Sequence, residues 1–211
     1  NTTALTPATI ADGSKYFEAK KYDGSGSTQS ITGLEFSPDL TWIKVQNASD
    51  HHILYDTVRG VRKQLYTNLT NAEETETQGL SAFTSDGFTV NGSHTVRGQT
   101  NDSGKNYISW NWDAGNAANP VSNTDGSITS QVRANTSAGF SIVSYTGSGS
   151  SATVGHGLNT TPSLVICKDL SGAEGWLTWF EGFSANEYLY LNTNAAKGSY
   201  SGTWGSTPTN S

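Results

Sequence analysis

The chain has 211 residues with a formal net charge of −6, and 14% of its residues are charged. It has no basic cluster, so we do not expect a nucleic acid as its partner. No stretch has the pattern of a signal peptide or of a membrane-spanning apolar run, and we expect no membrane insertion. Apolar residues make up 34% of the chain, but six Trp, nine Tyr and seven Phe can each bury a large area, which predicts a folded protein with a thin core.

Residues 1–14 are polar and are predicted to be a linker into the first domain. Beyond them, short stretches of alternating or β-branched residues are separated by Gly, Asn, Asp and Pro turn signals. This pattern is typical of an all-β fold. The strands predicted in this part are Tyr16–Tyr22, Gln29–Gly33, Leu40–Val45, His52–Thr57 and Gln64–Asn68.

The next part of the chain mixes polar loops with two strong strand signals. Thr70–Thr77 contains three glutamates and is predicted to be one helical turn or a polar loop. In Phe88–Val96 an Asn-Gly pair lies between two β-branched runs, which predicts a hairpin. In Tyr107–Trp112 the alternation places Trp110 and Trp112 on one face of a closing strand.

Much of the stretch from Phe17 to Glu73 recurs about 123 residues later. Phe17, Tyr22 and Gly24–Ser27 recur as Phe140, Tyr145 and Gly147–Ser150; after one inserted residue, Gly33, Leu34, Pro38, Leu40 and Lys44 recur as Gly157, Leu158, Pro162, Leu164 and Lys168. A register held this long indicates a duplicated domain. We therefore predict two tandem antiparallel β-sandwiches, of jelly-roll or lectin-like type, over residues 15–113 and 127–211, with a linker at 114–126.

The second copy is predicted to begin with an extra leading strand at Ser127–Arg133 and to be incomplete. The chain stops at the positions that correspond to Asp86 and Gly87, so we expect the second copy to lack its last strands. We interpret the chain, which starts with Asn and contains no Met, as a fragment of a longer protein. Its one cysteine, Cys167, aligns with Ile43 in a core strand and is expected to be a buried, inert thiol.

The densest polar group lies between His51 and Gly60. Adjacent histidines in a strand point to opposite faces, so we do not expect His51 and His52 to bind the same metal ion. We expect Asp56 and Arg59 to pair across a tight turn and to have a structural role. The glutamates of Thr70–Thr77 have no counterpart in the second copy and are not expected to form a catalytic pair. The sequence predicts no enzyme, no cofactor and no metal, and calcium in an Asp-Gly turn is the alternative left open.

Aromatic residues are the better functional indication. If Leu189 faces the core, then Trp176, Tyr188 and Tyr190 face outward with Asn192 beside them, and in the first copy Tyr66 faces outward too. Such rings stack on apolar sugar faces while amides bind hydroxyls, so these four residues are the predicted glycan-binding site. The alternative is that they pack against another domain or subunit, because interfaces also favour Trp and Tyr.

Specific motifs follow one another along nearly the whole chain: Ile10–Ser14, Ile31–Lys44, Leu54–Gly60, Thr84–Val90, Tyr107–Trp112, Asn123–Ser130 and Gly139–Gly147. Together they resemble the tandem repeat domains of marine bacteriophage (cyanophage-like) tail-fibre and virion surface proteins. Asp113 departs from that family, in which a Lys is common at this position. The resemblance implies a virion context and brings no catalytic residues with it.

We therefore expect a non-enzymatic structural and adhesive component of a bacteriophage virion, exposed on its surface outside the cell. The expected partners are further copies of the chain, in a homotrimer, together with other virion proteins and host surface glycans. One alternative is a head decoration or spacer protein that binds only virion proteins. The second is a glycan depolymerase, which would need two convergent carboxylates.

Overall fold

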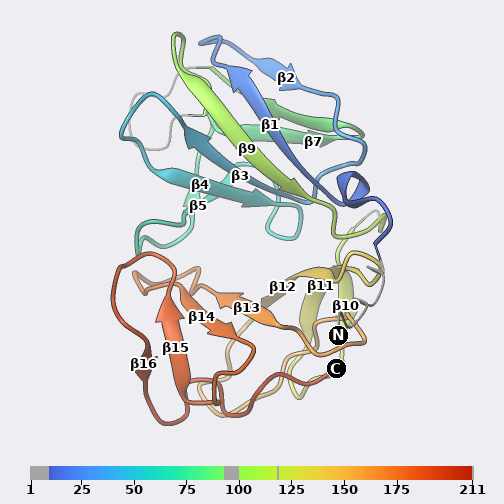
Figure 1. The fold of residues 1–211 in the computed structure, drawn as a ribbon, viewed down its shortest axis with the longest axis vertical. Coiled ribbons are helices and arrows are strands. Elements are labelled where there is room, and N and C mark those ends of the chain that lie inside the picture. Colours follow the sequence, from blue (N-terminus) through green and yellow to red (C-terminus); the bar gives the residue numbers. More distant parts are fainter. Residues whose placement is uncertain (1–9, 93–99, 118, 211) are drawn as a thin grey trace, which may run out of the picture.

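The computed structural model describes residues 10–92, 100–117 and 119–210, and within these ranges the regular elements are strands apart from one 3-10 turn, η1 (Gly13–Lys15). Figure 1 shows an upper half, which we call the first half (residues 10–117), and a lower half, the second half (residues 119–210). No helix in the described ranges is long and apolar enough to cross a membrane.

The first half contains two antiparallel sheets. Its strands are β1 (Phe17–Asp23), β2 (Gln29–Ile31), β3 (Leu40–Val45), β4 (His52–Asp56), β5 (Lys63–Tyr66), β6 (Glu74–Thr75), β7 (Leu80–Thr84), β8 (Gly87–Val90) and β9 (Asn106–Trp112). The larger sheet has the order β1-β9-β3-β4-β5-β6, and the smaller has the order β2-β8-β7. The closing strand β9 therefore lies between β1 and β3, and it pairs with both.

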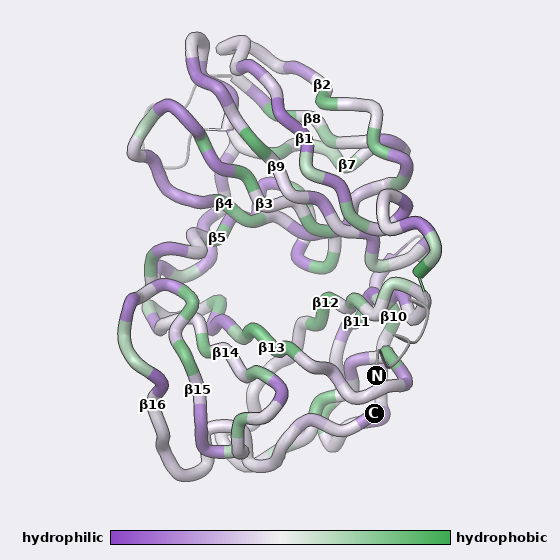
Figure 2. The backbone as a smooth tube through the Cα atoms, in the orientation of Figure 1, coloured by the Kyte–Doolittle hydropathy of each residue, from purple (hydrophilic) through white to green (hydrophobic). Residues whose placement is uncertain are grey.

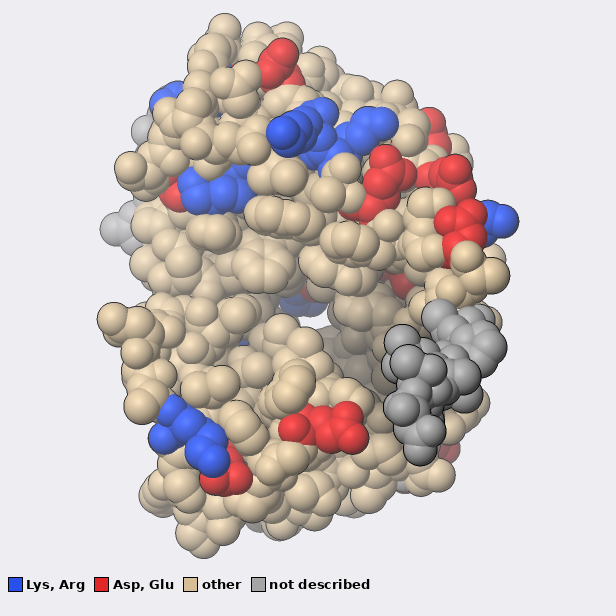
Figure 3. All heavy atoms as spheres, viewed as in Figure 1, with Lys and Arg blue, Asp and Glu red and all other residues tan. Residues whose placement is uncertain are grey.

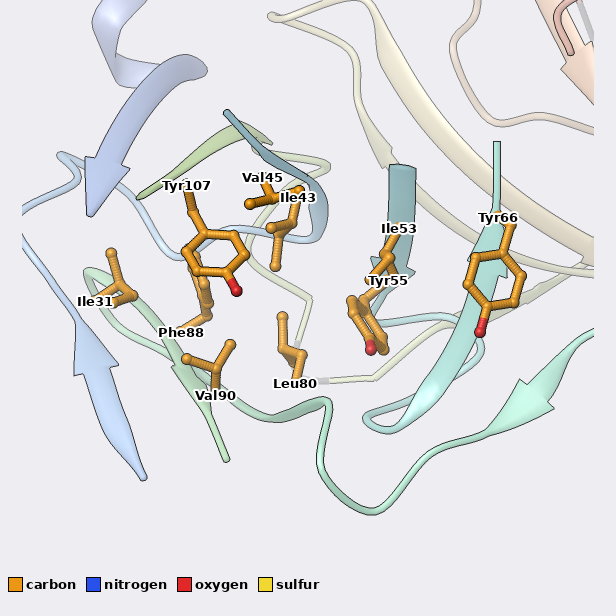
Figure 4. Close-up of a cluster of buried hydrophobic side chains, with 10 residues drawn as sticks. All are labelled: Ile31, Ile43, Val45, Ile53, Tyr55, Tyr66, Leu80, Phe88, Val90 and Tyr107. Carbon is orange, nitrogen blue, oxygen red and sulfur yellow. The ribbon is translucent and has the colours of Figure 1, made fainter. Parts of the chain in front are cut away.

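The core of the first half is made where alternate residues of the larger sheet meet the smaller sheet. In β3 the residues Thr41, Ile43 and Val45 are buried while those between them are partly exposed, which is the period-2 pattern of a sheet with one inner face. Figure 4 shows the buried cluster: Ile31, Ile43, Val45, Ile53, Tyr55, Tyr66, Leu80, Phe88, Val90 and Tyr107. Burying each of its larger aliphatic side chains contributes roughly 1.5–3 kcal/mol.

The second half also has two antiparallel sheets. Its strands are β10 (Val121–Asn123), β11 (Ser130–Asn135), β12 (Phe140–Tyr145), β13 (Leu164–Cys167), β14 (Leu177–Phe180), β15 (Glu187–Tyr190) and β16 (Gly198–Ser199). The sheet orders are β10-β11-β12 and β13-β14-β15-β16. Figure 2 shows that hydrophobic residues lie on β12 and β13, whereas much of the chain between strands is neutral or hydrophilic.

The sheet β13–β16 repeats the pairing of β3–β6 residue for residue. Leu40 pairs with Asp56 and Leu164 with Phe180; Ile53 pairs with Tyr66 and Leu177 with Tyr190; Gln64 pairs with Glu74 and Tyr188 with Gly198. Each residue named in the second half lies 124 positions after its equivalent in the first half. The repeat seen in the sequence is therefore a repeat of strand register over these four strands.

Side-chain hydrogen bonds recur at the same spacing. The amide oxygen of Asn68 accepts from the His52 backbone N–H at 3.0 Å, and that of Asn192 accepts from the Trp176 N–H at 2.9 Å. The Lys44 ammonium donates to the Val45 carbonyl at 2.6 Å, as that of Lys168 does to the next residue's carbonyl. The residue types at these positions recur because their side chains make hydrogen bonds to backbone groups.

Two sequence expectations about elements differ from the structure, and a third falls partly outside the described residues. The segment 114–126, predicted to be a linker, contains β10, which pairs with β11. Thr70–Thr77, predicted to be a helical turn or loop, contains the short strand β6, because its backbone pairs with β5. In the predicted hairpin at Phe88–Val96, β8 has β2 and β7 on its two edges, and residues 93–96 lie outside the described ranges.

Candidate functional site

The Asp56–Arg59 pair closes the turn after β4. Arg59 Nε donates to Asp56 Oδ2 at 2.6 Å, and the Arg59 backbone N–H donates to Asp56 Oδ1 at 2.8 Å. The guanidinium also donates to the carbonyls of Lys63 and Leu54 and to Glu73 Oε2 at 3.2 Å. Both side chains of the pair are nearly inaccessible, at 7% and 4%. The arrangement braces a turn and leaves little of the guanidinium for a ligand.

The three glutamates of this region are each engaged locally. Glu73 contacts Arg59 and also Lys63 at 3.5 Å, whereas Glu74 accepts from the Tyr66 hydroxyl at 3.2 Å. Glu76 Oε1 accepts from the backbone N–H of Gln78. Over the described part of the chain, no group of three or more His, Cys, Asp or Glu side chains is placed to hold a metal ion.

Trp176 lies in the contact between the two halves, and the expectation that it faces solvent is wrong. Trp176 is only 5% exposed to solvent. Its indole N–H donates to the carbonyls of Tyr66 at 3.0 Å and Leu69 at 3.1 Å, both in the first half. The expectation that Tyr66 faces outward is also wrong, because Tyr66 is 1% exposed within the core cluster.

The other members of the predicted platform are half-buried. Tyr188 and Tyr190 meet edge to face at 5.2 Å. Tyr190 lies over Gly175 and Tyr188 over Gly198, so that a Cβ added at either glycine would be 2.6 Å from a ring. The Asn192 amide oxygen is occupied by the Trp176 N–H. The structure thus brings the four residues near one another, with Trp176 withdrawn from solvent and the Asn192 oxygen engaged.

A second contact between the halves is built from polar groups. Arg133 Nη2 lies 2.9 Å from Asp39 Oδ1, and the two side chains are 11% and 2% exposed. Asp39 also accepts from the Ala114 N–H at 2.8 Å. Asn135 donates to Asp113 Oδ2 at 2.8 Å. Burial raises the pKa of Asp39, and the positive charge of Arg133 opposes that shift.

An aromatic-lined depression opens beside this contact, and sequence reasoning did not identify it. Its volume is about 390 Å³, and Phe17, Trp112 and Phe140 are among its lining residues. The Trp112 ring is 4.9 Å from the ring of Phe17 and is stacked at 6.0 Å on that of Phe140. The alternation that places Trp112 on the outer face of β9 was the available signal, but it could not show that Phe140 of the second half stacks on Trp112.

Charged side chains are scattered over the face shown in Figure 3, and an opening is visible between the two halves. In comparisons with known proteins, one family model, described as Domain of unknown function (DUF7483), matches residues 12–211. No curated protein and no solved structure matches the chain.

Proposed function

This chain belongs to the family described as Domain of unknown function (DUF7483), and because that description states no activity, we propose its function from the geometry. We propose that it is a non-enzymatic structural component of a bacteriophage virion surface, serving as a rigid segment of a fibre or appendage. The virion context rests on the motif resemblance described above. The rigid role rests on how the two halves are joined.

The observation that carries the proposal is the buried bonding between the halves. It combines the Arg133–Asp39 ion pair, the Trp176 indole donating to two first-half carbonyls, and a backbone bond of 2.8 Å from Glu73 N to the Leu170 carbonyl. Contacts between independently moving domains are usually more solvated than these. A segment that transmits force or sets spacing benefits from such a junction, because bending it would leave buried polar groups without partners.

The first experiment measures rigidity and mass in solution at near-neutral pH. NMR relaxation should give one rotational correlation time for both halves, and the variant Trp176→Ala should separate the two values. Light scattering should give three times the chain mass of 22.4 kDa if the segment forms the proposed homotrimer. Two independent correlation times in the unaltered chain would overturn the rigid role, and a monomer would remove self-trimerisation of this segment.

Glycan recognition is the second candidate, favoured by the depression at Phe17, Trp112 and Phe140, whose rings are of the kind that stack on sugars. Binding on a glycan array should be lost in Trp112→Ala. It should be retained in the control Phe180→Ala, because Phe180 is 53% exposed and does not line the depression. Loss in Tyr190→Ala alone would point instead to the platform of Tyr188 and Tyr190. Absence of any glycan binding would favour a decoration or spacer role, and release of reducing ends from a polysaccharide would favour a depolymerase.

A further inference from the structure

The second half lacks a neighbour that the first half has. In the first half, β9 pairs with β1 on one edge and with β3 on the other. The corresponding strands of the second half are β12 and β13; among the residues that the structure describes, β12 pairs only with β11 and β13 only with β14. In Figure 1, β12 lies between β11 and β13, and the Tyr145 hydroxyl of β12 lies 3.5 Å from the Cys167 sulfur of β13. The edges of β12 and β13 that have no partner strand in the described ranges therefore face each other.

Apolar side chains are exposed where these two edges meet. Leu164 and Ile166 of β13 are 53% and 43% exposed, and Tyr145 of β12 is 46% exposed. Tyr22, which corresponds to Tyr145, stacks on Tyr107 of β9 at 5.1 Å. No ring from the described part of the chain stacks on Tyr145, and its hydroxyl instead lies 3.5 Å from the Cys167 sulfur.

Cys167 shows what the absence of a covering strand does. Ile43, at the corresponding position of β3, is 0% exposed beneath the complete sheet. Cys167 was expected to be buried in the same way, but it is partly exposed. Unpaired backbone groups beside exposed apolar side chains are a template for the addition of a further strand.

We propose that the facing edges of β12 and β13 form an acceptor site for one β-strand of the β9 type, antiparallel to both. Its occupant is a peptide segment with alternating residues, in which Tyr, Ser and Asn face the core and Ile and Trp face outward, as in Asn106–Trp112. In the first half Ser109 lies opposite Lys20 and Ile43. A small residue of the occupant would therefore lie between Val143 and Cys167. This site does not depend on the function proposed above.

The first test uses Cys167, the one cysteine of the chain, as the reporter. The peptide Lys105–Asp113 is added to the full chain, and the reaction of Cys167 with a thiol reagent is followed. We expect the reaction to slow about tenfold or more, because only openings of the added strand would expose the thiol. The control is the same peptide with Ser109→Pro, which lacks an N–H that a strand needs and should give no protection.

The second test measures register. Cross-strand partners lie close enough for a disulfide. A peptide with Ser109→Cys should therefore form a mixed disulfide with Cys167 in a glutathione redox buffer. A peptide with Asn111→Cys, whose cysteine shares the same face but lies opposite the position of Val165, should form it about tenfold less readily or not at all.

Three outcomes would overturn the proposal. Equal protection by the Ser109→Pro peptide would show that the peptide binds without pairing as a strand. Equal disulfide yield from the two cysteine peptides would show that there is no defined register. A dimer of the chain, seen by sedimentation, that protects Cys167 and excludes the peptide would identify a second copy as the occupant.

Discussion

Asp39 and Arg133 form an ion pair of 2.9 Å between the two halves, with the side chains only 2% and 11% exposed. Removing one partner leaves the other buried and unpaired, so we expect Arg133→Met or Asp39→Leu alone to lower the free energy of unfolding by about 3–5 kcal/mol. The double variant should recover part of this loss, because both charges are then absent while the Ala114 N–H still lacks its acceptor. Urea unfolding of the four proteins measures the cycle, and single variants within about 1 kcal/mol of the parent would contradict it.

Trp176 should contribute through both its volume and its N–H. The substitution Trp176→Ala is expected to cost about 3–5 kcal/mol, as for other large buried aromatic residues. Trp176→Phe keeps much of the packing but removes the indole donor from the Leu69 carbonyl and from the Tyr66 carbonyl, which still accepts from the Leu69 N–H at 3.3 Å; this should cost about 1–3 kcal/mol. Equal destabilisation by both variants, measured by thermal and urea unfolding, would show that the hydrogen bonds contribute little.

His52 should make stability depend on pH. Burial, then the charges of Lys44 and His51, lower the pKa of His52 below its ordinary value of 6.5. The unfolded chain therefore binds more protons than the folded chain in the window below pH 6.5 and down to the folded pKa, so stability falls as pH decreases through it. Below the folded pKa this contribution becomes constant.

The variant His52→Gln should lack this component of the pH dependence. Urea unfolding of both proteins between pH 8 and pH 5 measures it, and the other three histidines are common to both. If the two curves run parallel across the window, His52 is not the responsible group.

Gly87 and Gly13 should respond differently to substitution by alanine. A Cβ on Gly87 would lie 1.8 Å from the Ile31 carbonyl oxygen, where β8 pairs with β2, whereas a Cβ on Gly13 would meet nothing within 4 Å. Gly87→Ala is therefore expected to destabilise the first half by about 2 kcal/mol or more, and Gly13→Ala to be near neutral. Similar unfolding midpoints for the two variants would refute the close approach.

Strand positions could be predicted from the sequence where the same pattern occurs in both copies of the repeat. Leu40–Val45 was predicted from its alternation, and β3 has these bounds. The direction of Tyr66 was not predictable, because the adjacent residues Leu65 and Tyr66 are both buried. Successive side chains of a strand point to opposite faces, so with both faces buried the period-2 pattern does not show which of the two residues belongs to the core.

The aromatic site was only partly predictable for a similar reason. Trp176, Tyr188 and Tyr190 were grouped from alternation, and the structure does place them close together. That Trp176 would donate to Tyr66, more than a hundred residues earlier, depends on how the halves dock. Neither spacing nor composition encodes that docking. The structural use of Asn192 could have been foreseen from its equivalence to Asn68, because both amides accept from a backbone N–H.

Because β3–β6 and β13–β16 share one register, equivalent positions of the two halves can be compared within the same chain. At the end of β4 stands Asp56, held by Arg59, and at the same point of β14 stands Phe180, beside Phe183 at 6.5 Å. The equivalent turn thus contains an ion pair in the first half and a pair of rings in the second. Grafting the turn of one half into the other would therefore show whether the ion pair and the pair of rings are interchangeable closures of the same backbone turn.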